Sequence, residues 1–115
     1  MIESVIENNN FFIVIENGNN IKFKLSLPML KCSKGSEWYD DEHVGQFIDN
    51  LKNNTEGSFI LTMPDDLKVV LDMLHIQFIF DNIVITLANT EQNRDYLIVI
   101  FEKFIDYLRD LTIRI

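Results

Sequence analysis

The sequence predicts an α+β fold, in which one antiparallel sheet of about five or six strands is packed by a short helix and a long C-terminal helix. Two observations predict it: apolar and polar residues alternate in the first quarter of the chain, and an apolar stripe of helical period occupies the last quarter. With 115 residues, 47% of them hydrophobic, the chain is long enough to bury one core. We therefore expect a single domain over residues 1–115.

The first predicted element is a β-hairpin over residues 11–27. Residues 11–15 are apolar and largely β-branched, and in the second half of the segment apolar residues alternate with lysine and serine. Asn17-Gly18 lies between the two runs, and this dipeptide between apolar strands is the strongest short-range signal for a hairpin turn. Residues 2–7 predict a further edge strand, whereas residues 28–40 show no periodicity and predict a loop.

A short helix is predicted next, over about residues 41–53. Its apolar residues recur at i, i+3, i+4 and i+7 and form one stripe: Val44, Phe47, Ile48 and Leu51. Residues 58–63 predict a strand. The segment 67–74 fits a helix or a strand equally well, and we favour the strand because β-type residues continue directly after it. Asp81-Asn82 predicts a tight turn into a last strand over residues 83–87.

The long helix is predicted over about residues 90–111. Asn89 and Gln92 have the spacing of a capping box at its start. Its apolar residues form one wide face: Leu97, Phe101, Phe104, Ile105, Leu108 and Leu111. At about 1.5 Å per residue such a helix is about 30 Å long, enough to lie across a whole sheet.

The charge of the chain is unevenly distributed. Acidic residues outnumber basic ones by 18 to 10, which gives a formal net charge of −8, and residues 35–81 hold ten of the acids against two lysines. This charge disfavours nucleic acid and an anionic membrane as partners, because both attract basic proteins. A basic protein is the partner that the charge favours.

Cysteine usage and apolar runs indicate the compartment. Cys32 is the only cysteine, so no internal disulfide can form, which is typical of a reducing environment. Residues 1–10 lack both a basic residue and a long apolar core, so we expect no signal peptide. The apolar run over residues 96–101 is far shorter than the roughly 20 residues of a membrane span. We therefore expect a cytoplasmic protein with no membrane partner.

The most distinctive stretch combines four carboxylates with two aromatic side chains: Glu37, Trp38, Tyr39, Asp40, Asp41 and Glu42. With His43 beside it, this acidic segment could serve acid–base catalysis, and its carboxylates could hold a hard cation. As a binding surface, carboxylates around exposed aromatic rings suit the arginines of a basic partner. The structural alternative is that the acids cap the following helix and Trp38 packs onto the core.

The sequence indicates no other chemistry. His43 and His75 are far apart, and no third residue completes the ligand set that zinc requires. Cys32 has no identifiable base that would activate its thiol. Neither a glycine-rich phosphate loop nor a nucleophile elbow occurs. We therefore expect no cofactor, no metal and no enzymatic activity.

The organisation of the chain resembles that of the small acidic immunity proteins of bacterial contact-dependent growth inhibition and polymorphic toxin systems. The resemblance lies in the hairpin through Asn17-Gly18, the Trp38 loop that leads into residues 44–51, the strands that end at residues 83–87, and the helix over residues 96–111. It implies a cytoplasmic, non-enzymatic inhibitor that binds one cognate toxin domain, often a nuclease.

Electrostatics agrees with this implication. A nuclease binds a polyanion in a basic cleft, and a carboxylate-rich inhibitor can imitate the phosphates and occlude that cleft. We therefore expect the acidic segment to bind the toxin. Three alternatives stay open: a viral or mobile-element inhibitor of a host nuclease, a small ligand-binding or enzymatic domain with an apolar pocket under the long helix, and a homo-oligomer formed through Phe11-Phe12 or an edge strand.

Overall fold

The structure is a computed structural model that describes residues 2–17, 19–25, 29–31, 37–39, 42–53, 58–62 and 67–114. Within these ranges it describes the backbone alone for residues 17, 19, 29–31, 37–39, 42, 43 and 111–114. The predicted α+β class is confirmed: two antiparallel sheets pack with two helices, one of them long and C-terminal.

The N-terminal sheet has the order β1-β2-β3, formed by β1 (Ile2–Glu7), β2 (Asn10–Asn17) and β3 (Asn19–Leu25). The predicted hairpin and edge strand are therefore confirmed, with Asn17 opposite Asn19 across a turn whose central residue lies outside the described ranges. Asn8 and Asn9 connect β1 to β2 with positive φ values of 51° and 65°, a backbone region that asparagine tolerates better than most residues.

The second sheet has the order β6-β7-β8-β9, with strands β6 (Phe59–Thr62), β7 (Lys68–Leu71), β8 (His75–Phe80) and β9 (Ile83–Ala88). The ambiguous segment after residue 67 thus contains a strand, as favoured. Asp81, at a φ of 52°, and Asn82 form the predicted two-residue turn, because Phe80 pairs with Ile83.

Two sequence predictions about the strands are wrong. Residues 28–40 were expected to form a loop, but β4 (Met29–Lys31) and β5 (Glu37–Tyr39) pair there as a short antiparallel ribbon. Three-residue strands are too short to carry a periodic signal. A single sheet of about five or six strands was also expected, whereas the described strands form a three-stranded sheet, a four-stranded sheet and this ribbon. Sheet membership depends on which edges meet, and local alternation does not encode that.

Both helices lie close to their predicted bounds, as α1 (Glu42–Asn53) and α2 (Glu91–Arg114). The predicted capping box at the start of α2 is wrong by one residue. The N-cap is Thr90, whose side-chain oxygen accepts a hydrogen bond from the Asn93 backbone N–H at 3.2 Å. Asn89 instead uses its side chain to bond to the neighbouring turn, described below.

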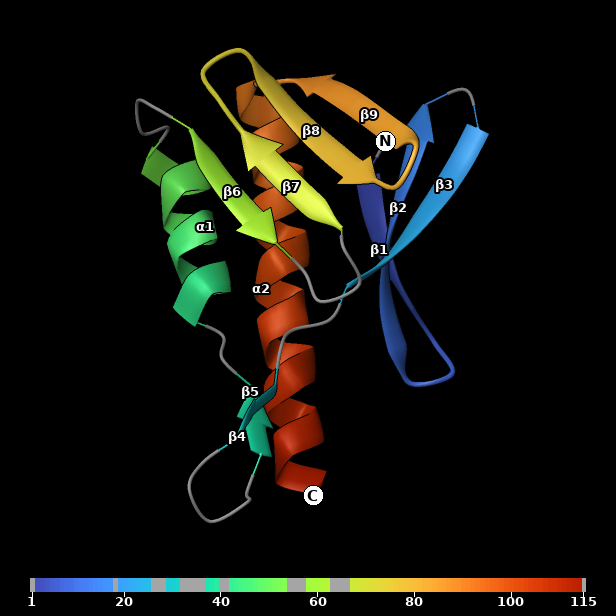
Figure 1. Ribbon diagram of the computed structural model, residues 1–115, viewed down its shortest axis with the longest axis vertical. Helices are drawn as coiled ribbons and strands as arrows, with labels where there is room; N and C mark the ends of the chain where they lie inside the picture. The colour runs from blue at the N-terminus through green and yellow to red at the C-terminus, as the bar shows by residue number, and fades with distance from the viewer. Residues whose placement is uncertain are drawn as a thin grey trace.

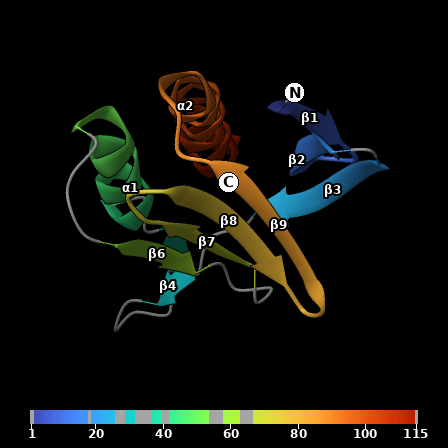
Figure 2. The ribbon, with the colours of Figure 1, turned by 90° about the horizontal axis from the view of Figure 1, so that it is seen from above.

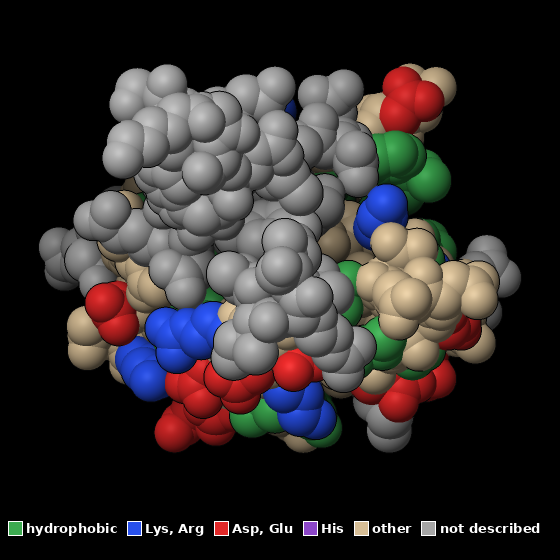
Figure 3. Space-filling model, turned by 90° about the horizontal axis from the view of Figure 1, so that it is seen from below, with side chains coloured by type: hydrophobic (Ala, Val, Ile, Leu, Met, Phe, Trp, Pro, Cys, Tyr) green, Lys and Arg blue, Asp and Glu red, His purple; other side chains and the backbone are tan. Residues whose placement is uncertain are grey.

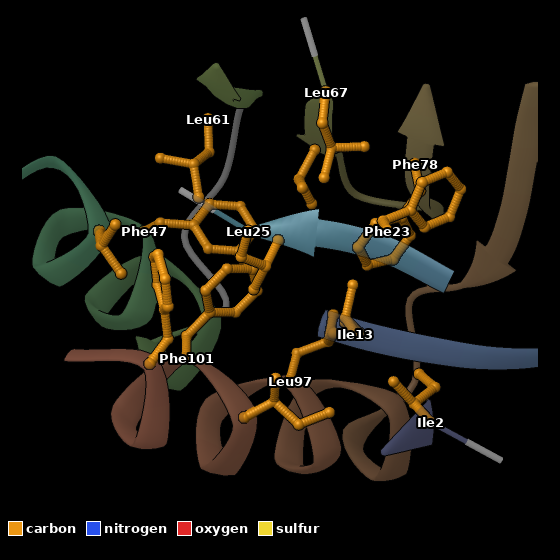
Figure 4. Close-up of a cluster of buried hydrophobic side chains, with 14 of the residues drawn as sticks. Ile2, Ile13, Phe23, Leu25, Phe47, Leu61, Leu67, Phe78, Leu97 and Phe101 are labelled. Atoms are coloured by element: carbon orange, nitrogen blue, oxygen red, sulfur yellow. The ribbon is translucent and has the colours of Figure 1, made fainter. Parts of the chain in front are cut away.

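The two helices cover one face of the four-stranded sheet, and the three-stranded sheet lies beside α2 (Figures 1 and 2). Phe101 of α2 meets Phe47 of α1 with ring centroids 5.2 Å apart (Figure 4). Phe104, on the next turn of α2, lies 5.2 Å from Phe11 of β2. The Tyr107 hydroxyl, further along α2, donates a hydrogen bond to the Asn9 carbonyl oxygen. One helix face thus joins α1 to the N-terminal sheet.

The predicted apolar stripes form the core. All four stripe residues of α1 are buried, as are four of the six predicted for α2: Leu97, Phe101, Phe104 and Leu108. Ile105 is partly buried, and the Leu111 side chain lies outside the described residues. Phe23 of β3 stacks on Phe78 of β8 at 6.0 Å, which joins the two larger sheets.

Replacing Phe101 by alanine is expected to lower the free energy of unfolding by about 3–5 kcal/mol, because the ring is fully buried and its loss leaves a cavity. Val99→Ala, on the exposed side of the same helix, is expected to cost less than about 0.5 kcal/mol. Urea denaturation followed by circular dichroism measures both. Equal losses for the two variants would contradict the assigned helix face.

Candidate functional site

The structure places the acidic segment at the junction of β5 and α1. Glu37, Trp38 and Tyr39 form β5, and Glu42 is the first residue of α1. Asp40 and Asp41 lie outside the described residues, as do the side chains of the other four. The prediction that these six residues form one binding surface therefore stays a prediction.

The backbone around the acidic segment is anchored at both ends. Trp38 pairs with Leu30 of β4, and β5 contacts α2, beside whose lower half it lies in Figure 1. At the other end, α1 packs against α2 and β6 and buries its apolar stripe. The segment therefore starts and finishes on elements that are tied to the core.

Elsewhere the described acidic side chains are interspersed with basic ones. Glu102 of α2 forms an ion pair with Lys52 of α1 at 2.9 Å, and Glu7 pairs with Lys22 across the N-terminal sheet at 2.8 Å. Figure 3 shows red and blue side chains next to one another along the lower edge of the view. The outer side of the helices thus carries mixed charge. Such exposed pairs contribute at most about 1 kcal/mol each.

The β7–β8 turn is held by a network of side-chain hydrogen bonds. The Asp72 carboxylate accepts hydrogen bonds from the backbone N–H groups of Leu74 at 2.8 Å and His75 at 2.6 Å. The Asn89 side chain donates to the Asp72 carbonyl oxygen at 2.6 Å, and its own oxygen accepts from the Arg94 guanidinium at 2.7 Å. These bonds fasten the turn to the junction of β9 and α2.

This hydrogen bonding sets the charge state of Asp72. The backbone N–H groups of His75 and Leu74 point at the carboxylate and lower its pKa, because they stabilise the ionised form. His75 adds a smaller lowering effect on the same pKa, with its Nδ1 atom 3.8 Å from the Asp72 carboxylate oxygen. At neutral pH the turn is therefore held by a negative charge.

The turn displays two apolar side chains to solvent. Met73 and Leu74 are 66% and 72% exposed, the highest values among the exposed large hydrophobic residues. Sequence reasoning missed them, because they continue an apolar run that looks like core. An aspartate that caps backbone N–H groups two and three residues later is a known turn signal, and it could have located this turn. Exposed apolar side chains on a hydrogen-bonded turn are suited to contacting another protein.

A pocket of about 380 Å³ lies between the two larger sheets. Its floor includes Phe23 and Leu67, which are buried, and Phe80 and Ile83 line it from the β8–β9 hairpin. Phe12, Lys22 and Lys24 complete the lining. The pocket is therefore apolar with two cations at its rim. A second hollow, of about 530 Å³, lies between β1 and α2.

The described residues contain no group of three His, Cys, Asp or Glu side chains close enough to hold a metal ion. Cys32 and the His43 side chain fall outside the described ranges. Within the same part of the chain, no helix is both long and apolar enough to cross a membrane.

Comparison of the chain with models of protein families, with curated proteins and with solved structures finds no match.

Replacing Asp72 by asparagine is expected to lower the free energy of unfolding at neutral pH. The loss is expected to be smaller at acid pH. A carboxylate with a lowered pKa stabilises the folded state above its unfolded-state pKa, and this contribution is lost as the pH falls through the folded-state pKa. The urea midpoint of the wild type should therefore exceed that of Asp72→Asn at pH 7, and the gap should close below about pH 4. A gap of the same size at neutral and acid pH would contradict this account.

Proposed function

We propose that this chain is an immunity protein, which binds a cognate toxin domain and neutralises it by covering a basic active site such as that of a nuclease. The observation that carries the proposal is the concentration of charge: residues 35–81 contain ten acids and two lysines, while the whole chain has a net charge of −8. The acidic segment over residues 37–42 contributes four of those acids and both of its aromatic residues.

The position of the acidic segment supports the proposal. It runs from β5 into the first turn of α1, where the positive end of the helix dipole favours negative charge. Both flanking elements contact the core, so the two ends of the segment need not be ordered when a partner binds.

The proposed mechanism is mimicry of a polyanion. The carboxylates of Glu37, Asp40, Asp41 and Glu42 take the places of phosphates and accept hydrogen bonds from toxin lysines and arginines. Trp38 and Tyr39 supply the apolar contacts that ion pairs alone lack. Opposite net charges steer the two proteins together, which speeds association. With the cleft occupied, the toxin's substrate is excluded.

The test is a triple charge reversal, Asp40→Lys, Asp41→Lys and Glu42→Lys, in a chain co-expressed with a candidate toxin domain taken from a neighbouring gene. Affinity for that domain is expected to fall by about 100-fold or more, because three attractive contacts become repulsive. Isothermal titration calorimetry measures the affinity, and growth of the co-expressing cells measures protection.

The matched control is the same change of charge at exposed positions outside the acidic segment, Glu3→Lys, Glu16→Lys and Asp95→Lys. We expect this control to retain most of the affinity and all of the protection. If both triple variants bind like the wild type while circular dichroism shows intact folds, the acidic segment is not the toxin-binding surface. If a genuine neighbouring toxin is not bound by the wild type at all, a host nuclease becomes the better target.

A second candidate function, binding of a small apolar anion, is favoured by the pocket between the sheets. Its volume falls in the range of small-molecule sites, and its aromatic floor beside Lys22 and Lys24 suits a ring or acyl chain that bears an acidic group. The Lys22 ammonium lies 5.7 Å from the centre of the Phe12 ring and is held by Glu7, so Lys24 is the better candidate to bind such an anion.

Anilinonaphthalene sulfonate, an aromatic anion, is the probe for this second function. We expect saturable binding, displaced by decanoate and weakened about tenfold or more by Ile83→Glu, which places a carboxylate at the pocket rim. Val99→Glu, on the exposed side of α2, is the control and should bind as the wild type does. Equal binding by all three proteins would mean that the probe does not occupy this pocket.

A further inference from the structure

The free edge of β9 carries none of the residues that usually block strand pairing. Its six residues, Ile83–Ala88, contain no charge, no proline and no glycine, and Ile83 and Val84 are exposed. Within the described chain β9 pairs only with β8. Natural proteins usually block such an edge with lysine, proline or a bulge, because its unpaired N–H and C=O groups attract another strand.

The two-residue turn determines which backbone groups are free. The residues that flank such a turn, Phe80 and Ile83, form a hydrogen-bonded pair, so every second residue of β9 from Ile83 bonds to β8. The intervening residues, Val84, Thr86 and Ala88, direct their backbone groups away from β8. The Ala88 carbonyl oxygen points away from β8 as this alternation requires, because it accepts hydrogen bonds from the Thr90 N–H and the Asn93 side chain, both at 2.9 Å.

The other edges of the two larger sheets differ from β9. Edge strand β1 carries Glu3 and Glu7, and edge strand β3 carries Lys22 and Lys24, so both have charges that oppose pairing. The remaining edge, β6, is uncharged but only four residues long, and α1 packs beside it. Among these four edges, β9 is therefore the one that is both long and uncharged.

We propose that β9 pairs with β9 of a second copy of this chain, antiparallel, about a twofold axis that passes beside Ile85. Val84 of each copy then lies opposite Thr86 of the other copy. The outward backbone N–H and C=O groups of both residues can therefore form hydrogen bonds between the two strands. The two four-stranded sheets become one continuous sheet of eight strands. This inference is independent of the proposed toxin binding.

The β9 edge suits a second copy of the chain because no charged side chain lies where the two copies would meet. The chain carries −8 overall, which opposes self-association, but the outer-face positions of the sheet near the edge are uncharged. The row of cross-strand neighbours that starts at Thr86 continues through Gln77, Val70 and Ile60, none of which is charged. The row that starts at Val84 continues through Ile79, and its first charged residue is Lys68 on β7. No acid faces another acid across the proposed axis.

The chosen register also brings opposite charges together. With Ile85 on the axis, the Asp81-Asn82 turn of the second copy lies beyond the paired strands, at the end where Asn89 of the first copy follows β9. Asn89 binds the guanidinium of Arg94 through its side-chain oxygen at 2.7 Å and its carbonyl oxygen at 3.3 Å. An aspartate thus approaches an arginine at each end of the paired strands. This complementarity favours a second copy over an acidic partner strand.

The interface is small, so we expect a dissociation constant of about 10–100 µM, typical of weak interfaces. Sedimentation velocity from low to high micromolar concentration measures it. Thr86→Lys and Val84→Lys each place a cation on the paired edge and are expected to raise the dissociation constant about tenfold or more.

Each variant has a matched control on the opposite edge strand, on the same face of the sheet. Thr62→Lys is the control for Thr86→Lys, and Ile60→Lys, at a residue 53% exposed against 56% for Val84, is the control for Val84→Lys. Both controls should dimerise as the wild type does, and circular dichroism confirms that each variant is folded. A wild type that stays monomeric at several hundred micromolar, or variants and controls that dimerise equally, would overturn the proposal.

Discussion

Burial of one face of α2 is the constraint on which the rest of the structure depends. Phe101 packs against Phe47 of α1, and one turn later Phe104 packs against Phe11 of β2. Because these contacts lie on the same helix, the position of α2 fixes the position of both neighbours. Loss of this face would therefore separate α1 and the N-terminal sheet from each other as well as from the helix, so its cost exceeds that of any surface contact.

This arrangement decides which surfaces stay open. Both helices lie on one face of the four-stranded sheet, so its other face and its β9 edge have no covering helix in the described chain (Figure 2). Hydrogen bonds from Asn89 to the carbonyl oxygens of Asp72 and Leu74 fix the turn at one end of this sheet and leave the Met73 and Leu74 side chains in solvent. The exposed apolar residues Met73 and Leu74 therefore lie on a turn that hydrogen bonds hold, which makes them suited to binding.

Local features were predictable from the sequence and relations between distant segments were not. The hairpin turns and the helical stripes lie within a few residues, so their periodicity located both sheets' hairpins and both helices. How the two larger sheets meet depends on Phe23 stacking against Phe78, and these residues are far apart in the chain. The attachment of the turn at Met73 to the start of α2 likewise depends on the distant Asn89. The residue types were enough to identify the acidic segment in the sequence. They could not predict the geometry of its side chains, because side-chain positions depend on packing against distant parts of the chain.

The two proposed interfaces use different physical forces, and the charge distribution allows them to coexist. An acidic segment binds through long-range attraction to a basic partner, which needs net negative charge. Strand pairing needs the opposite, a local absence of charge, since like charges across an edge repel. In the sequence the six residues of β9 are uncharged, while all ten acids of residues 35–81 precede it. Because the two requirements fall on different segments, neither interface weakens the other, and a dimer formed through β9 would carry two acidic segments.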